Sequence, residues 1–140
     1  MSEIAKPVAQ PTSWTKSLWE GCAQGKLMIL RCMRCSKNHA PTRRICDCSS
    51  MDMEWRQSKG EGVIATFTVV HRAPDPAFKA DLPYVIAIIE LDEGVRLMSN
   101  LVEFDVQSLF IGQRVRCLFD VVVQESDEQK ALGVPKFTLV

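Results

Sequence analysis

The stretch 32-CMRCSKNHAPTRRICDC-48 holds four of the six cysteines in the chain. Two residues separate Cys32 from Cys35, and one residue separates Cys46 from Cys48. Two cysteine ligands from each of two turns is the usual way to build a tetrahedral zinc–thiolate site. The spacing therefore predicts one zinc ion bound by all four cysteines.

The second pair departs from the usual two-residue gap. A one-residue gap can still chelate a metal, but in a more strained or more extended turn. His39 lies between the two pairs and is an alternative ligand if Cys48 cannot reach the metal. A site that has lost its metal and packs as a loop is the competing interpretation.

Disulfide and redox chemistry explain these cysteines less well than zinc. Residues 1–14, MSEIAKPVAQPTSW, contain no apolar segment typical of a secretory signal, and no apolar run approaches the ~20 residues of a membrane span. We therefore expect a cytoplasmic protein, in which cysteines stay reduced. A Cys-x-x-Cys redox motif belongs at a helix N-terminus in a βαβ setting, which the sequence does not predict.

The predicted metal is structural. A catalytic zinc keeps an open position beside a general base, whereas every candidate ligand in the two pairs is a thiolate. Cys22 and Cys117 stand alone in the sequence, and we expect both to be buried packing residues.

The N-terminal part of the chain reads as a tail, a helix and a ribbon. Residues 1–12 contain two prolines and no apolar periodicity, which predicts a flexible tail. Thr12 or Ser13 could cap a helix over 13–25 that places apolar side chains on one side. That side packs on the protein's own core or docks on a partner, and the pattern favours neither. The residues concerned are Trp14, Leu18 and Trp19.

Residues 26–58 are predicted to form a zinc ribbon of the rubredoxin-like kind. LMILR at 27–31 and MEWRQ at 53–57 read as strands that flank the two cysteine pairs. So small a unit cannot fold on apolar burial alone, and we expect the metal to hold it together.

Residues 59–140 are predicted to form a barrel, which makes the chain mainly β. Segments rich in β-branched residues alternate with turn signals, and Asp92-Glu93-Gly94 is a tight hairpin signal. Five strands and one helical turn at 104–110 suit an OB-fold, with a half-open β-sandwich as the competing architecture. The predicted strands cover 60–72, 84–92, 95–103, 114–123 and 134–140, and a polar turn covers 125–130.

Charge divides the chain into two halves. Residues 1–59 carry ten Lys and Arg against five Asp and Glu, a balance of +5, and residues 60–140 carry seven against twelve, a balance of −5. The first half therefore meets an acidic surface, or the halves attract each other, or the basic residues form a solvated face. The basic residues nearest the cysteines are Arg31, Arg34, Lys37, Arg43 and Arg44.

The sequence does not predict catalysis by this chain alone. It contains two histidines, His39 and His71, and neither a Gly-x-Ser-x-Gly motif nor a phosphate loop. An isolated histidine at a strand end, such as His71, is more often a hydrogen-bonded structural residue than a general base.

An ordered set of segments resembles a known family. The segments are LWEGCAQGKLMILRCMRC (18–35), MEW (53–55), KGEGVIATFTVVHRAP (59–74), PYVIAIIELDEGVRLMSNLV (83–102), IGQRVRCLF (111–119) and PKF (135–137). They are similar to the zinc-ribbon/OB-fold proteins, long catalogued as a domain of unknown function, that accompany thiolase-superfamily enzymes. Cys46-Asp47-Cys48 departs from the two-residue gap usual in that family.

The resemblance implies a non-catalytic accessory subunit in a hetero-oligomer. The thiolase-like partner, for example a benzoylsuccinyl-CoA thiolase, would supply the catalytic groups and bind most of the CoA. The helix would then offer Trp14, Leu18 and Trp19 to the partner. The loop 73–83 and its neighbours would contact CoA through His71, Arg72, Phe78, Lys79 and Tyr84.

A single-stranded nucleic-acid-binding module is the alternative, because OB-folds also serve that role. Such a binder needs a basic groove with exposed aromatic platforms. The barrel half carries −5. We also expect most of its aromatic side chains to lie in the core, namely Phe67, Phe78, Tyr84, Phe104, Phe110, Phe119 and Phe137.

Overall fold

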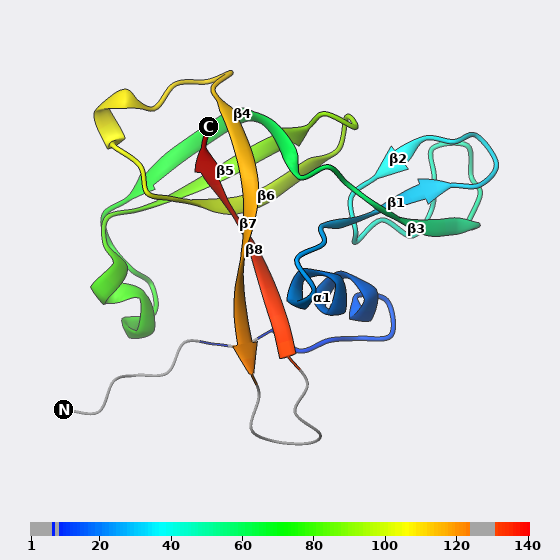
Figure 1. The fold of residues 1–140 in the computed structure, drawn as a ribbon, viewed down its shortest axis with the longest axis horizontal. Coiled ribbons are helices and arrows are strands. Elements are labelled where there is room, and N and C mark those ends of the chain that lie inside the picture. The colour runs from blue at the N-terminus through cyan, green and yellow to red at the C-terminus, as the bar shows by residue number, and fades with distance from the viewer. Residues whose placement is uncertain (1–6, 8, 124–130) are drawn as a thin grey trace.

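The computed structural model describes residue 7, residues 9–123 and residues 131–140. It contains a small ribbon sheet, a closed barrel and one α-helix between them (Figure 1). Most of the predicted tail and the predicted turn at 125–130 lie outside the described residues. Within the described part of the chain, no helix is long and apolar enough to cross a bilayer.

The barrel has five strands: β4 (Glu61–Val70), β5 (Tyr84–Leu91), β6 (Arg96–Val102), β7 (Arg114–Val123) and β8 (Ala131–Leu139). Their order around the barrel is β4-β5-β6-β8-β7, with β7 pairing back onto β4. Neighbouring strands are antiparallel except β6 and β8, which are parallel. This closed barrel confirms the OB-fold prediction over the half-open sandwich.

Alternation along the strands builds the barrel core. Every second residue of β5 is buried from Val85 to Leu91, as period-2 patterning requires. Near the start of β4, a Cβ added at Gly62 would lie 2.3 Å from the carbonyl oxygen of Glu90. Glycine is therefore required at position 62 for β4 and β5 to approach this closely.

Two short 3₁₀ helices connect the strands. η1 (Pro76–Asp81) lies within the loop predicted at 73–83, and the Asp75 carboxylate accepts a hydrogen bond from the Ala77 N–H at 2.8 Å. η2 (Val106–Ser108) forms the helical turn predicted at 104–110 and is capped by Asp105 in the same way.

Helix α1 (Lys16–Ala23) is shorter than the predicted 13–25. Before the helix, the Thr12 N–H donates to the Thr15 hydroxyl oxygen at 3.0 Å, and the Thr15 N–H donates to the Thr12 hydroxyl oxygen at 3.3 Å. Residues 12–15 therefore form a turn instead of helix. Gly25, at φ 76°, follows shortly after the helix. The helix packs against β8, where Gly133 leaves room for its backbone.

The ribbon sheet has the order β2-β1-β3, from β1 (Met28–Cys32), β2 (Asn38–His39) and β3 (Met53–Gln57). The sequence predicted β1 and β3 but treated the segment containing β2 as a turn-rich loop. That segment pairs with β1 through two residues, with His39 opposite Leu30.

One apolar core runs from the ribbon through α1 into the barrel. Leu27 and Ile29 of the ribbon side belong to the same buried cluster as Leu18, Cys22 and the barrel residue Phe137. Strands β1 to β3 lie within the predicted ribbon range 26–58, and β4 to β8 lie within the predicted barrel range 59–140. The division of the chain into separate domains at that boundary stays a prediction.

Candidate metal centre

The four cysteines of the opening stretch meet at one end of the ribbon. Their sulfur atoms all lie within 4.8 Å of one another, with 3.6 Å between Cys32 and Cys48 and 3.4 Å between Cys35 and Cys46. A tetrahedral zinc–thiolate site has sulfurs about 3.8 Å apart, from Zn–S bonds of about 2.3 Å. A disulfide needs about 2.05 Å, and all four cysteines are free. The donor set therefore fits a tetrahedral thiolate-bound metal, as the spacing predicted.

Each cysteine pair is presented by a turn that ends on a serine. Ser36 and Ser49 follow the second cysteine of their pairs and adopt positive φ angles, 66° and 71°. The Ser36 N–H bonds the Cys32 carbonyl oxygen at 2.9 Å, and the Ser49 N–H bonds the Cys46 carbonyl oxygen at 2.8 Å. The second turn closes on the same pattern one residue sooner, so Cys48 reaches the cluster despite the shorter gap.

Backbone N–H groups favour the thiolate at the first pair. Those of Cys35 and Arg34 hydrogen-bond the Cys32 sulfur and lower the pKa of Cys32 to about 6, against an opposing effect of burial. At the second pair, the Cys48 N–H lowers the pKa of Cys46. Burial and the contact with the Cys35 sulfur outweigh it, so the pKa of Cys46 is raised.

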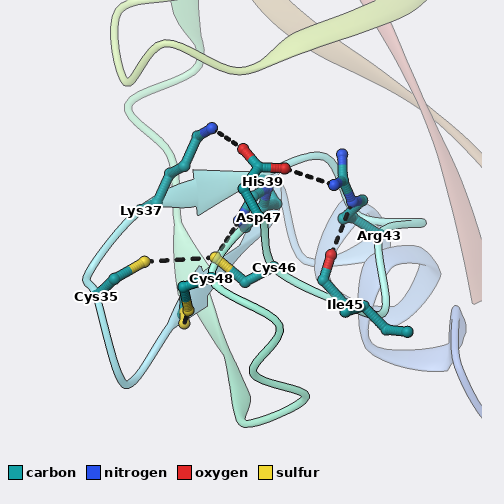
Figure 2. A network of polar contacts seen from close by, with 9 residues as sticks. Cys35, Lys37, His39, Arg43, Ile45, Cys46, Asp47 and Cys48 are labelled. Atoms are coloured by element: carbon teal, nitrogen blue, oxygen red, sulfur yellow. Dashed lines mark hydrogen bonds and ion pairs between the residues drawn. The ribbon is translucent and has the colours of Figure 1, made fainter.

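His39 lies beside the cluster and is buried, with 6% of its surface exposed. Its Nε2 atom is 3.1 Å from the Cys46 sulfur (Figure 2). Burial, with a further contribution from Arg43, lowers the pKa of His39, which favours the neutral ring. The sequence analysis left the choice between Cys48 and His39 open. The structure brings the Cys48 sulfur into the cluster and sets the His39 ring against a sulfur.

Asp47, between the two cysteines of the second pair, is held by two cations. Lys37 and Arg43 both bond its carboxylate, with 2.6 Å between Arg43 Nη2 and Asp47 Oδ1 (Figure 2). The Arg43 Nε also donates to the Ile45 carbonyl oxygen at 2.8 Å. Part of the basic excess in the first half of the chain is therefore used inside the ribbon, to hold the second turn.

The two remaining cysteines pack against the core, but only Cys22 is buried as predicted, and Cys117 is half-buried. Cys22 is fully buried in the core, and burial raises its pKa to about 11. Cys117 packs against the same core, and burial raises its pKa to about 12. Both pKa values lie well above neutral, so these thiols stay protonated and unreactive.

The three predicted partner residues do not form one exposed face. Trp14 is 54% exposed, and the Arg44 guanidinium carbon lies 3.8 Å from its ring centroid. Trp19 is half-buried against the core. Leu18 is buried in the core itself, because it lies on the face of α1 that meets the barrel. Leu18 keeps 9% of its surface exposed, and its contact with a partner stays a prediction.

The five predicted CoA-contact residues lie around one end of the barrel. Val70, the last residue of β4, pairs with Tyr84 at the start of β5, so His71 and Arg72 follow directly beside Tyr84. The Phe78 ring of η1 lies 6.4 Å from the Tyr84 ring, centroid to centroid. His71, Arg72 and Lys79 are exposed.

An exposed apolar surface near η2 was not predicted. Phe110 is 59% exposed and Ile111 66%, although the sequence analysis expected Phe110 to lie mainly in the core. The loop turns outward because Ile64 of β4 bonds the backbone of the next two residues, Gly112 and Gln113, at 2.7 and 3.0 Å. Of the other aromatic residues expected in the core, Phe137 is buried, and Phe67, Phe104 and Phe119 pack against the core. Phe78 and Tyr84 are half-buried outside the core cluster.

The fold and the cysteine cluster together define a class of protein, in which a cysteine-bearing ribbon is joined to an OB-fold barrel. Residues 55–120 match the family model described as the ChsH2 C-terminal OB-fold domain. A DUF35 domain-containing scaffold protein from Methanocaldococcus jannaschii is 36% identical over 104 residues, which cover 73% of this chain and 73% of the relative. The chain belongs to the DUF35 family.

Three further similarities agree with this assignment. A probable enoyl-CoA hydratase alpha subunit from Thermomonospora curvata is 37% identical over 98 residues, which cover 69% of this chain but 30% of that larger relative. A chain of the solved Ltp2-ChsH2(DUF35) aldolase is 32% identical, with a TM-score of 0.73 over 96% of this chain and 98% of that one. A DUF35-family protein of unknown function from Sulfolobus solfataricus shares the fold at 14% identity and a TM-score of 0.57.

Proposed function

We propose that this chain is a non-catalytic accessory subunit that binds and stabilises a thiolase-superfamily enzyme acting on acyl-CoA. One observation carries the proposal: the chain matches, over nearly the full length of both, a chain of an aldolase whose name joins Ltp2 to ChsH2(DUF35). Relatives named as DUF35 scaffold proteins support the same role.

The chemistry of the described residues also favours a scaffold. The four clustered cysteines form a complete tetrahedral donor set, which is typical of structural zinc. His39 contacts one of those sulfurs and is 6% exposed, so it is poorly placed to meet a substrate. We therefore assign the nucleophile and the acid–base groups to the partner.

Exposed apolar side chains are the proposed partner contacts. Trp14 offers a large ring already oriented by Arg44, and aromatic and arginine side chains are enriched among residues that dominate interface energies. Trp19 lies on α1, which follows the turn that carries Trp14, and would contribute through its exposed edge, with Leu18 supporting it from the core. Phe110 and Ile111 offer a second apolar contact on the barrel.

The end of the barrel beside η1 is the proposed CoA contact. Arg72 and Lys79 supply exposed positive charge for phosphates, and the rings of Phe78 and Tyr84 supply an apolar surface for pantetheine or adenine. His71 lies at the start of the same loop. In this arrangement the partner binds most of the CoA and the barrel covers its exposed part.

Co-purification tests the proposal. We expect the chain, co-expressed with a thiolase-like enzyme from the same genome, to elute as one hetero-oligomer on size exclusion. Trp14→Ala should weaken the complex at least tenfold in a titration, because it removes an aromatic interface contact. Lys16→Ala, an exposed neighbour on α1, is the control and should leave affinity unchanged. A chain that stays monomeric beside this enzyme would contradict the proposal.

Assays of the isolated chain separate the proposal from its alternatives. We expect no acyl-CoA turnover, and no retention on single-stranded DNA at physiological salt, since the barrel half carries −5. Acyl-CoA hydrolysis abolished by His71→Ala would instead identify an enzyme. Salt-dependent DNA retention would support the nucleic-acid module.

A further inference from the structure

The two cysteine turns differ in length. In the first turn, the Ser36 N–H bonds the Cys32 carbonyl oxygen at 2.9 Å across three intervening residues. In the second turn, the Ser49 N–H bonds the Cys46 carbonyl oxygen at 2.8 Å across two intervening residues. The shorter turn therefore has one fewer backbone N–H near its first sulfur than the longer turn.

The His39 side chain lies against the first sulfur of this shorter turn. His39 Nε2 lies 3.1 Å from the Cys46 sulfur, within hydrogen-bonding distance of a nitrogen and a sulfur. Cys46 is 3% exposed and His39 is 6% exposed, so water has little access to either partner. His39 is carried by β2, whose pairing with β1 fixes its position opposite Leu30.

The charge of the site gives this bond its importance. Four thiolates around a divalent cation carry a net charge of −2, and hydrogen bonds to the sulfurs are what stabilises such charge in a partly buried site. Outer donors of this kind also orient their ligands, and removing one typically costs 10–100-fold in metal affinity.

We propose that His39 donates its Nε2–H to the Cys46 sulfur and so replaces the backbone donor that the shortened second turn lacks. His39 is thus a positioning residue of the metal centre and not a metal ligand. Asp47 holds the same turn from the outside, through Lys37 and Arg43. The role of His39 is independent of which enzyme the chain binds.

The tautomer of His39 in the unmodified chain is the first test. In the zinc-loaded protein with ¹⁵N-labelled histidine, we expect a neutral ring with the proton on Nε2. A proton on Nδ1 with a bare Nε2 would overturn the proposal, because that nitrogen could not donate. A direct one-bond ¹⁵N–¹¹³Cd coupling at a His39 ring nitrogen in the cadmium-loaded protein would overturn it too, since His39 would then be a ligand.

A double-variant cycle is the second test. His39→Phe keeps a ring but removes the donor, and we expect zinc affinity in a chelator competition to fall 10–100-fold. A glycine inserted between Asp47 and Cys48 restores the two-residue gap and its extra N–H. We expect that insertion to recover at least tenfold in the His39→Phe background and to change affinity little when His39 is present.

The cobalt-loaded protein and a neighbouring variant complete the cycle. His39→Phe should shift the thiolate-to-cobalt charge-transfer band while the spectrum stays that of four sulfurs. Asn38→Ala is the matched control, because Asn38 lies on the same strand but its amide donates to the Glu93 carbonyl oxygen. We expect its zinc affinity to stay within twofold. Unchanged affinity in His39→Phe, or an insertion that fails to recover the double variant, would overturn the proposal.

Discussion

Two serines in the ribbon occupy positions that usually belong to glycine. Ser36 and Ser49 have φ angles of 66° and 71°, in the left-handed region that costs a residue with a Cβ about 1–2 kcal/mol. Both turns need this angle, because the chain must reverse directly after the second cysteine for its sulfur to reach the cluster. The ribbon therefore keeps local strain at the two points that shape the metal centre.

Replacing one of these serines by glycine should stabilise the ribbon. We expect Ser36→Gly to raise the free energy of unfolding by about 0.5–1 kcal/mol, since relief of the strain exceeds the entropy that glycine adds to the unfolded chain. Urea denaturation of the zinc-loaded protein measures the change. A loss of stability would mean that the Ser36 side chain makes a contribution larger than the strain.

At the scale of elements, helix α1 depends on a close approach to β8. A Cβ added at Gly133 would lie 2.3 Å from the Cys22 carbonyl carbon and 2.5 Å from the Ala23 nitrogen. Both are backbone atoms of α1, so neither can move unless the helix moves. Leu18 and Cys22 enter the core through this contact.

Gly133→Ala should therefore destabilise the protein by about 1–3 kcal/mol, the usual cost of overpacking, and lower its thermal midpoint. Gly21→Ala is the comparison, because its added Cβ meets the Met28 side chain at 2.5 Å, which can rotate away. Differential scanning calorimetry should rank Gly133→Ala as the more damaging change. Equal midpoints for Gly133→Ala and the unmodified protein would contradict the tight contact between α1 and β8.

At the scale of the whole molecule, one glutamate links the ribbon to the barrel. The Glu93 carboxylate accepts bonds from Ser58 Oγ and the Lys59 N–H, each at 2.9 Å, and its carbonyl oxygen accepts one from Asn38 at 3.3 Å. Leu27 and Ile29 also enter the core that the barrel shares. Packing and hydrogen bonds thus attach the ribbon to the barrel, and the cysteine cluster holds the two turns of the ribbon together.

Loss of the metal should loosen the ribbon and spare the barrel. Cys35→Ser is the cleanest variant, because Cys35 is exposed and its loss leaves no cavity. With free zinc at 1,000 times its Kd, removing the site should cost about 4 kcal/mol. We expect amide exchange to accelerate in β1 to β3 and to change little in β5. Equal acceleration in β5 would mean that the ribbon and barrel unfold as one unit.

The sequence by itself determined the cysteine cluster and the barrel. Cysteine spacing and strand alternation are local patterns, so a short range of residues is enough to predict their outcome. The spacing of Cys32 and Cys35 predicts one turn, and the alternation from Val85 to Leu91 predicts one buried face of β5. The ordered segments also indicated the family, which the comparisons confirm.

Only the tertiary structure decided what each side chain faces. Periodicity places Leu18 on one side of a helix, but the position of β8 decides that this side is buried. The same holds for Phe110, turned outward by bonds to Ile64, and for His39, set against Cys46 by a strand of two residues. Each of these contacts joins separate segments of the sequence. No local sequence pattern predicts such a contact, because burial and hydrogen bonding depend on which other segment packs against the residue.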